Sequence, residues 1–153
     1  MTQDAVALVR AHLEAEDRQD LDATMATFSQ ECWYSIPTQG YLLRGQEAVR
    51  AHYASLFGSF PDLVNEEVTL HDAGDRVFAT IVVRRHHRGA WGPFPATGRE
   101  VVTHALAEFP VGTDGLLEAE IVHINPLEAL HQIGVVPTQS VMELAHLYHQ
   151  TTS

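Results

Sequence analysis

Histidine is the side chain of this sequence best suited to proton transfer, and it occurs ten times. Its unperturbed pKa of about 6.5 lets it act as an acid or a base close to neutral pH. His104 lies in the β-rich stretch 101–109, where Val102 and Leu106 share its face by the two-residue period of a strand. It is either an acid/base that faces a pocket or a structural histidine among apolar neighbours.

Asn125 and His123 form a second candidate pair near the end of the last predicted strand. They share a strand face with Ile121, so an inward Asn125 implies an inward His123 and a polar cluster with His104 on the adjacent strand. The alternatives are that Asn125 only caps the helix that begins at Pro126, and that His123 faces solvent at a subunit rim.

Histidine and cysteine spacing does not favour a metal site. His86 and His87 are adjacent and would point to opposite faces of a strand, and neither His-x-His nor His-Glu-x-x-His occurs. His87 is either a ligand contact or part of a solvated strand end. The single cysteine, Cys32, excludes an internal disulfide and is more typical of a small buried side chain than of a nucleophile. We expect no functional metal.

Composition excludes several further classes. The formal net charge is −11, which disfavours nucleic acid and anionic membrane surfaces as partners. All nine basic residues are arginine, and without lysine neither a Schiff base nor covalently bound pyridoxal phosphate can form. No run of 18 apolar residues and no signal peptide is evident, so a cytoplasmic location is the default expectation.

Hydrophobic periodicity predicts helices first and strands afterwards. Helices are expected from Val6 to Leu13, over 21–28 behind an Asp20 cap, and over 48–58, 126–133 and 138–150. Strands are expected over 32–36, 63–71, 76–85, 101–109 and 116–125, with turn residues at 72–75 and 112–115. This order predicts an α+β domain, with an antiparallel sheet that curves around one apolar pocket.

Aromatic side chains are placed where they could line that pocket, although core packing is an equally ordinary role for each. They are Trp33, Tyr34, Tyr53, Phe57, Trp91 and Phe94. Gly89, Gly92 and two prolines flank the last two, which suggests a mobile flap over a flat ligand.

The chain divides into a domain over residues 1–137 and a helical extension over 138–153. Val141, Leu144, Ala145 and Tyr148 form an apolar stripe on this extension at helical spacing, so we expect it to dock. It could cover the pocket mouth or pack on a partner subunit.

Several segments together resemble the SnoaL-like polyketide cyclases, a family of the nuclear transport factor 2-like superfold. They occur in one register over about residues 5–137: 28–34 with Pro37, 44–53, 60–63, 73–77, 87–89, 95–101 and 130–134 with Pro137. The resemblance implies a conical antiparallel sheet, a hydrophobic small-molecule ligand, no cofactor and a homodimer. It implies ring closure by intramolecular aldol condensation, or a related lyase or isomerase reaction.

The same resemblance locates the chemistry. The family's proton-transferring aspartate stands seven residues before the glutamine of its C-terminal signature, and here that position, counted from Gln132, is Asn125. An amide can hold a developing oxyanion but cannot exchange a proton near neutral pH. His104 would then be the acid/base. The alternatives are a non-catalytic binding protein and a cofactor-free hydroxylase or monooxygenase.

Overall fold

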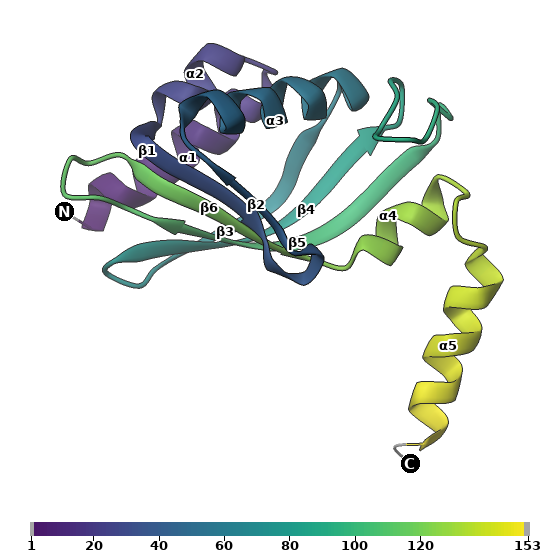
Figure 1. Ribbon diagram of the computed structural model, residues 1–153. Coiled ribbons are helices and arrows are strands. Elements are labelled where there is room, and N and C mark those ends of the chain that lie inside the picture. The colour runs from purple at the N-terminus through teal and green to yellow at the C-terminus, as the bar shows by residue number, and fades with distance from the viewer. Residues whose placement is uncertain (1, 152–153) are drawn as a thin grey trace.

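Three N-terminal helices cover one face of a curved sheet in the computed structural model, which describes residues 2–151 (Figure 1). The helices are α1 (Thr2–Asp17), α2 (Leu21–Ala26), α3 (Gln46–Ser59), α4 (Pro126–Gln132) and α5 (Thr138–Thr151), with a 3₁₀ turn at Pro37–Gln39. The strands are β1 (Phe28–Ile36), β2 (Tyr41–Arg44), β3 (Val64–Asp72), β4 (Arg76–His86), β5 (Glu100–Pro110) and β6 (Leu117–Ile124).

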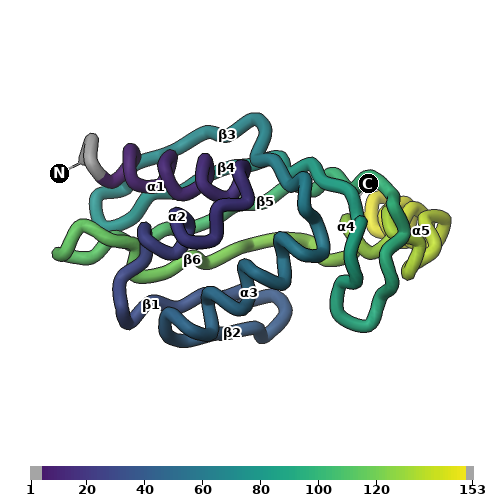
Figure 2. Tube along the Cα trace, turned by 90° about the horizontal axis from the view of Figure 1, so that it is seen from above, coloured from purple at the N-terminus to yellow at the C-terminus, as the bar shows by residue number. Residues whose placement is uncertain are grey.

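The strands form one sheet in the order β2-β1-β6-β5-β4-β3. β1 runs parallel to β6, and the other neighbouring pairs are antiparallel. The sheet is not closed, because β2 and β3 remain as its two edges. Seen from above, α1 lies over the β3 side of the sheet and α3 over the β1–β2 side (Figure 2).

The predicted α+β fold is confirmed, and three details are corrected. An entirely antiparallel sheet is wrong for β1 and β6, which a long connection separates, so that parallel pairing is sterically possible. Phe28, expected in the second helix, opens β1, and residues 41–44, expected in a loop, form β2. The Asp20 cap is confirmed, since its Oδ1 accepts a hydrogen bond from the Ala23 amide at 2.9 Å.

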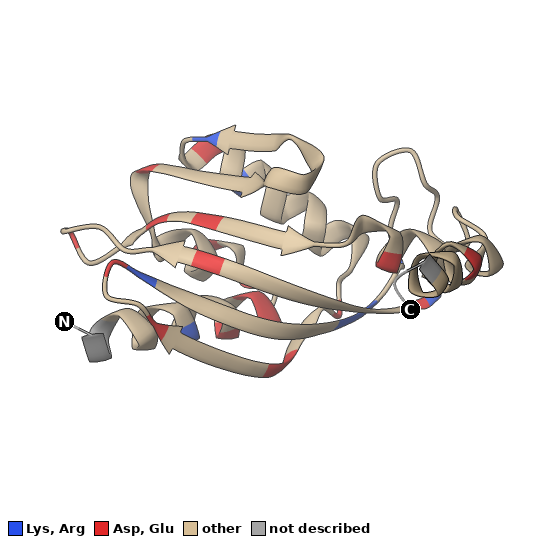
Figure 3. Ribbon diagram, turned by 90° about the horizontal axis from the view of Figure 1, so that it is seen from below, with Lys and Arg blue, Asp and Glu red and all other residues tan. Residues whose placement is uncertain are grey.

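The core fills the space between the helices and the concave face of the sheet. The apolar stripe of α1 supplies Val9 and Leu13 to the core, and α3 supplies Val49 and Tyr53. All four side chains are buried. The other face of the sheet is left uncovered by helices (Figure 3). No helix of the described residues is long and apolar enough to cross a membrane.

The loop between β4 and β5 is anchored. The amides of Arg88 and Gly89 both donate to the carbonyl of Ser59, and the Ser59 hydroxyl donates to the carbonyl of Ala90. Gly89 packs so closely on the end of α3 that an added Cβ would lie 2.9 Å from the carbonyl carbon of Gly58. The first residues of the β4–β5 loop are therefore fixed to α3. Any flap motion of this loop is restricted to the residues at its tip.

The C-terminal helix α5 extends away from the sheet and contacts α4 (Figure 1). Met142, Leu144, Leu147 and Tyr148 are each more than half exposed. It does not cover the pocket mouth of its own chain, so docking on a partner subunit stays a prediction.

Gly89→Ala should lower the free energy of unfolding by about 1–3 kcal/mol, the usual cost of overpacking, because its Cβ meets rigid backbone. Thermal unfolding followed by circular dichroism measures this. Gly58→Ala is the matched control, since a Cβ there meets nothing within 4 Å and alanine favours a helix. Equal melting temperatures for the two variants would contradict the close approach.

Candidate active site

A pocket of about 160 Å³ lies between α1, α3 and the concave face of the sheet. Cavities of about this size hold an aromatic ring. Its walls are mainly apolar, with Leu13, Ile81, Val83, Ala105 and Val122 among them. The polar side chains that reach it are Glu16, Tyr34, Gln39, His52, Tyr53, Asn65, Arg85, Thr103, Glu120 and Asn125.

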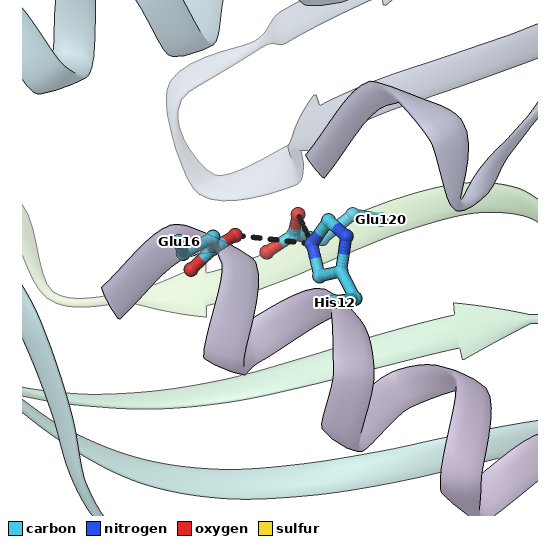
Figure 4. A group of neighbouring side chains, drawn as sticks. All are labelled: His12, Glu16 and Glu120. Atoms are coloured by element: carbon cyan, nitrogen blue, oxygen red, sulfur yellow. Dashed lines mark ion pairs between the residues drawn. The ribbon is translucent and has the colours of Figure 1, made fainter. Parts of the chain in front are cut away.

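His12, Glu16 and Glu120 form a buried trio (Figure 4), of which Glu16 and Glu120 line this pocket. His12 and Glu16 are one turn apart on α1, and Glu120 comes from β6. His12 Nε2 lies 3.0 Å from Glu16 Oε1 and 3.4 Å from Glu120 Oε2. The other ring nitrogen, Nδ1, lies 2.8 Å from the Thr27 hydroxyl, so a protonated ring can donate on both sides.

Electrostatics keep the ring of His12 charged. Burial alone would lower its pKa, but the hydrogen bonds to Glu120 and Glu16 outweigh burial and raise the pKa of His12 to about 10. An imidazolium between two buried carboxylates compensates part of their desolvation, which alone would be prohibitive.

The two carboxyls differ although both face His12. Burial and then the charge of Glu16 raise the pKa of Glu120, despite the hydrogen bond from His12. Burial acts on Glu16 as well, but the closer imidazolium and the amide of Asn65, 3.0 Å away, lower the pKa of Glu16 overall. Of the two carboxyls, Glu120 is therefore the one whose pKa is raised and Glu16 the one whose pKa is lowered.

Two tyrosines complete the surroundings of Glu120. The Tyr53 hydroxyl donates a hydrogen bond to Glu120 and lies 3.2 Å from His12 Nε2. Tyr34 is the direct neighbour of Glu120 across the β1–β6 pairing and lines the pocket. Burial and then the charge of Glu120 raise the pKa of Tyr34 well above its usual value, so its hydroxyl remains a hydrogen-bond donor.

His52 also lines the pocket, and its ring packs on Tyr34 with centroids 4.0 Å apart. Burial lowers the pKa of His52 to about 4, so this ring is neutral where His12 is charged. Its Nε2 is shielded from solvent and has no hydrogen-bond partner among the described residues.

The expected inward orientation of His104 is corrected by the structure. Its side chain is 72% exposed, on the uncovered face, and Nδ1 lies 2.5 Å from Glu128 Oε1. The strand alternates as expected, but Thr103 and Ala105 take the inward face. His104 instead borders a wide hollow of about 620 Å³ with Thr69, Val82 and Leu106, which is open to solvent.

The expected cluster of His123, Asn125 and His104 does not form. His123 points to the outer face, where Nε2 lies 2.7 Å from Glu108 Oε1. Asn125 follows β6, and its Oδ1 caps α4 by accepting from the Leu127 amide at 3.1 Å. It also lines one end of the pocket, so capping and pocket contact coexist in this residue.

The predicted aromatic residues divide between the pocket and its supports. Tyr34, Tyr53 and Trp91 line the pocket, whereas Trp33 does not. Phe57 packs behind Tyr53, with ring centroids 5.8 Å apart. His87 and Phe94 pack against Trp91 instead of reaching the ligand space, and burial lowers the pKa of His87.

Sequence reasoning missed His12, Glu16 and Glu120. The signal was present for two of them, because His12 and Glu16 continue the inward stripe of Val9 and Leu13 at helical spacing. A charged residue at such a position signals a buried polar site. Glu120 shares its face of β6 with Val122 and Ile124 by the two-residue period, but the sequence alone does not show that this face is the inward one.

The trio also has the composition of a metal site, since its ligand atoms lie within 4.8 Å of one another. Its geometry favours an ion pair, because the imidazole nitrogen that would bind a metal is directed at both carboxylates. A metal would have to displace the proton that this arrangement holds.

Comparison with known proteins assigns the chain to a family. The sequence pattern of the SnoaL-like domain matches residues 9–120. The chain belongs to the SnoaL-like family. That match ends at Glu120 and includes the whole trio. No curated protein matches the sequence closely enough to add a function.

Several solved structures superpose on this chain over nearly their whole length. A candidate polyketide cyclase from Xanthomonas campestris pv. campestris is 26% identical, with a TM-score of 0.79, and the match covers 87% of this chain and 98% of that one. A candidate hydroxylase from Streptomyces galilaeus is 23% identical, with a TM-score of 0.78 and coverage of 90% and 100%. A candidate isomerase from Bacillus subtilis is 15% identical, with a TM-score of 0.73 and coverage of 88% and 95%.

Because folded His12 is charged, the free energy of unfolding should fall as the pH becomes alkaline. Its folded pKa lies above the unfolded value of 6.5, so its contribution is fully present below pH 6.5 and is lost as pH rises through about 10. We expect the free energy of unfolding to fall by on the order of 5 kcal/mol over this range. Urea unfolding at stepped pH measures it.

His12→Gln should be less stable at neutral pH and should lose most of that alkaline decline. The control is His71→Gln, which removes an exposed histidine from β3 and should keep the decline. The same pH dependence in His12→Gln as in the unchanged protein would contradict the buried imidazolium.

Proposed function

We propose that this SnoaL-like protein is a cofactor-independent enzyme that moves a proton next to a carbonyl group, as in an aldol-type cyclase or an isomerase. The observation that carries the proposal is Glu120, a buried carboxyl whose pKa is raised by burial and which lines an apolar pocket of ring size. A general base works best when its pKa lies near the working pH. The polyketide cyclase and isomerase descriptions of related folds support the same reaction class.

In the proposed reaction Glu120 takes a proton from the carbon beside the carbonyl, and the electron pair of that C–H bond moves to the carbonyl oxygen. His12 and Tyr53 hold the carboxylate in position. The Tyr34 hydroxyl is the donor placed to stabilise the enolate oxygen, since it lines the pocket beside Glu120.

The enolate can then react in either of two ways. In an isomerase, a different carbon takes the proton back from Glu120. In a cyclase, the enolate carbon forms a bond to a second carbonyl carbon, whose oxygen receives that proton. Asn125, at the end of the pocket, is proposed to hydrogen-bond to that second oxygen while it caps α4. His104 has no role in this proposal, because it lies on the outer face.

The test is deuterium exchange of 2-tetralone, a ketone built on one aromatic ring, followed by proton NMR in D₂O. The protein should accelerate loss of the signals beside the carbonyl, and Glu120→Gln should reduce this by about 10²-fold or more, the usual contribution of a general base. Glu118→Gln, an exposed glutamate two residues earlier on β6, is the matched control and should keep the full rate.

Equal rates in Glu120→Gln and Glu118→Gln would overturn the role of Glu120. Binding of 2-tetralone with no exchange above the buffer rate would favour a binding protein over an enzyme.

A further inference from the structure

Arg85 is an arginine that lines the pocket. Strand alternation directs Arg84 outward, where it pairs with Glu66 and Glu100, and Arg85 inward to the pocket. Arg85 forms no ion pair with a carboxylate of the described residues. One terminal nitrogen donates to the Thr103 hydroxyl at 3.1 Å, and Nε is shielded from solvent without a hydrogen-bond partner among those residues.

Such an arrangement costs free energy in the empty pocket. A guanidinium removed from water without a counter-charge is unfavourable, and an unmade hydrogen bond adds to this. Burial lowers the pKa of Arg85 to about 10, while Tyr34 and Glu128 oppose the shift, so the group is still a cation at neutral pH. An anion that enters the pocket would remove much of this cost.

The packing of Arg85 on Phe60 does not account for its position. The guanidinium carbon lies over the ring, 4.8 Å from its centroid, in a cation–π contact. Such a contact does not use the N–H donors, which lie along the edge of the guanidinium plane. That edge matches a carboxylate, which accepts two parallel hydrogen bonds from an arginine.

The charges of the pocket are separated along the sheet. Ile121 pairs with Glu108 and Phe109 pairs with Val77, which sets Glu120 level with Val77, eight positions before Arg85 (85 − 77 = 8). The pKa of Tyr34 responds to both charges, because burial and then Glu120 and Glu16 raise it while Arg85 lowers it. One end of the pocket is therefore acidic and the other end is cationic.

We propose that the ligand of this pocket is an aromatic or alicyclic carboxylate whose acid group pairs with Arg85 while its ring extends towards Glu120. The carboxylates of Glu16 and Glu120 repel an anionic group at their end and so fix the direction of binding. The apolar walls with Tyr34 and Trp91 hold the ring. This inference deepens the proposed function by naming the charge class of its substrate.

The test compares two probes of equal shape, 2-naphthoate and neutral 2-naphthamide, by calorimetric titration. The unchanged protein should bind 2-naphthoate at least tenfold more tightly. Arg85→Gln should abolish this preference, and Arg85→Lys, which keeps the charge but not the fork, should restore part of it. Arg84→Gln, which removes the outward neighbour, should retain the full preference.

Equal affinities of the unchanged protein for both probes would overturn the proposal whether or not the variants fold, and so would an undiminished preference in folded Arg85→Gln. Glu120→Gln separates this inference from the proposed function. It should keep or strengthen the preference for 2-naphthoate while it loses exchange of 2-tetralone. A preference for the anion in a protein that catalyses no exchange would sustain the ligand class and overturn the catalytic proposal alone.

Discussion

The ion pair between His12 and two glutamates is the interaction around which the interior is organised. Two carboxylates within an apolar interior would each lose several kcal/mol of hydration, and a single imidazolium, whose Nε2 faces both of them while Nδ1 bonds to the Thr27 hydroxyl, offsets part of that loss. Removing one member leaves the others buried without compensation. The trio therefore ties α1 to β6, and the pocket lies beside this contact.

The distribution of charge follows from strand alternation and not from the overall composition. The chain carries a net charge of −11, but this number does not show where the charges lie. Arg84 and Arg85 take opposite faces of β4, and the inward Arg85 places a cation in a pocket whose other charged side chains are Glu16 and Glu120. Its uncompensated position and the raised pKa of Glu120 are both consequences of burial. They favour a ligand that is itself polarised, with an anionic end and a reactive carbon.

The fold could be predicted from the sequence to a large extent, whereas the site could be predicted only in part. Turn residues and hydrophobic periods located both hairpins and the helix order, because these signals are local. Which face of a strand points inward is a non-local property, and this is why His104 and His123 were assigned to the wrong side. For Asn125, helix capping alone and a position in the pocket were alternatives, and the structure combines the cap with the pocket position. Tyr34 and Tyr53 were located correctly, since large aromatic side chains near a core have few other places to go.

The parallel pairing of β1 with β6 has a consequence for how the protein is made. Tyr34 and Glu120 are paired neighbours in space but 86 residues apart in the chain (120 − 34 = 86), so this contact closes a very long loop. Contacts of such high sequence separation form late and slow the overall folding rate. While β6 is still inside the ribosome, His12 and Glu16 have no third partner and the central gap of the sheet stays open beside β5. Synthesis must therefore reach almost the end of the domain before the trio can assemble and the hydrogen-bonding edges at the centre of the sheet can pair.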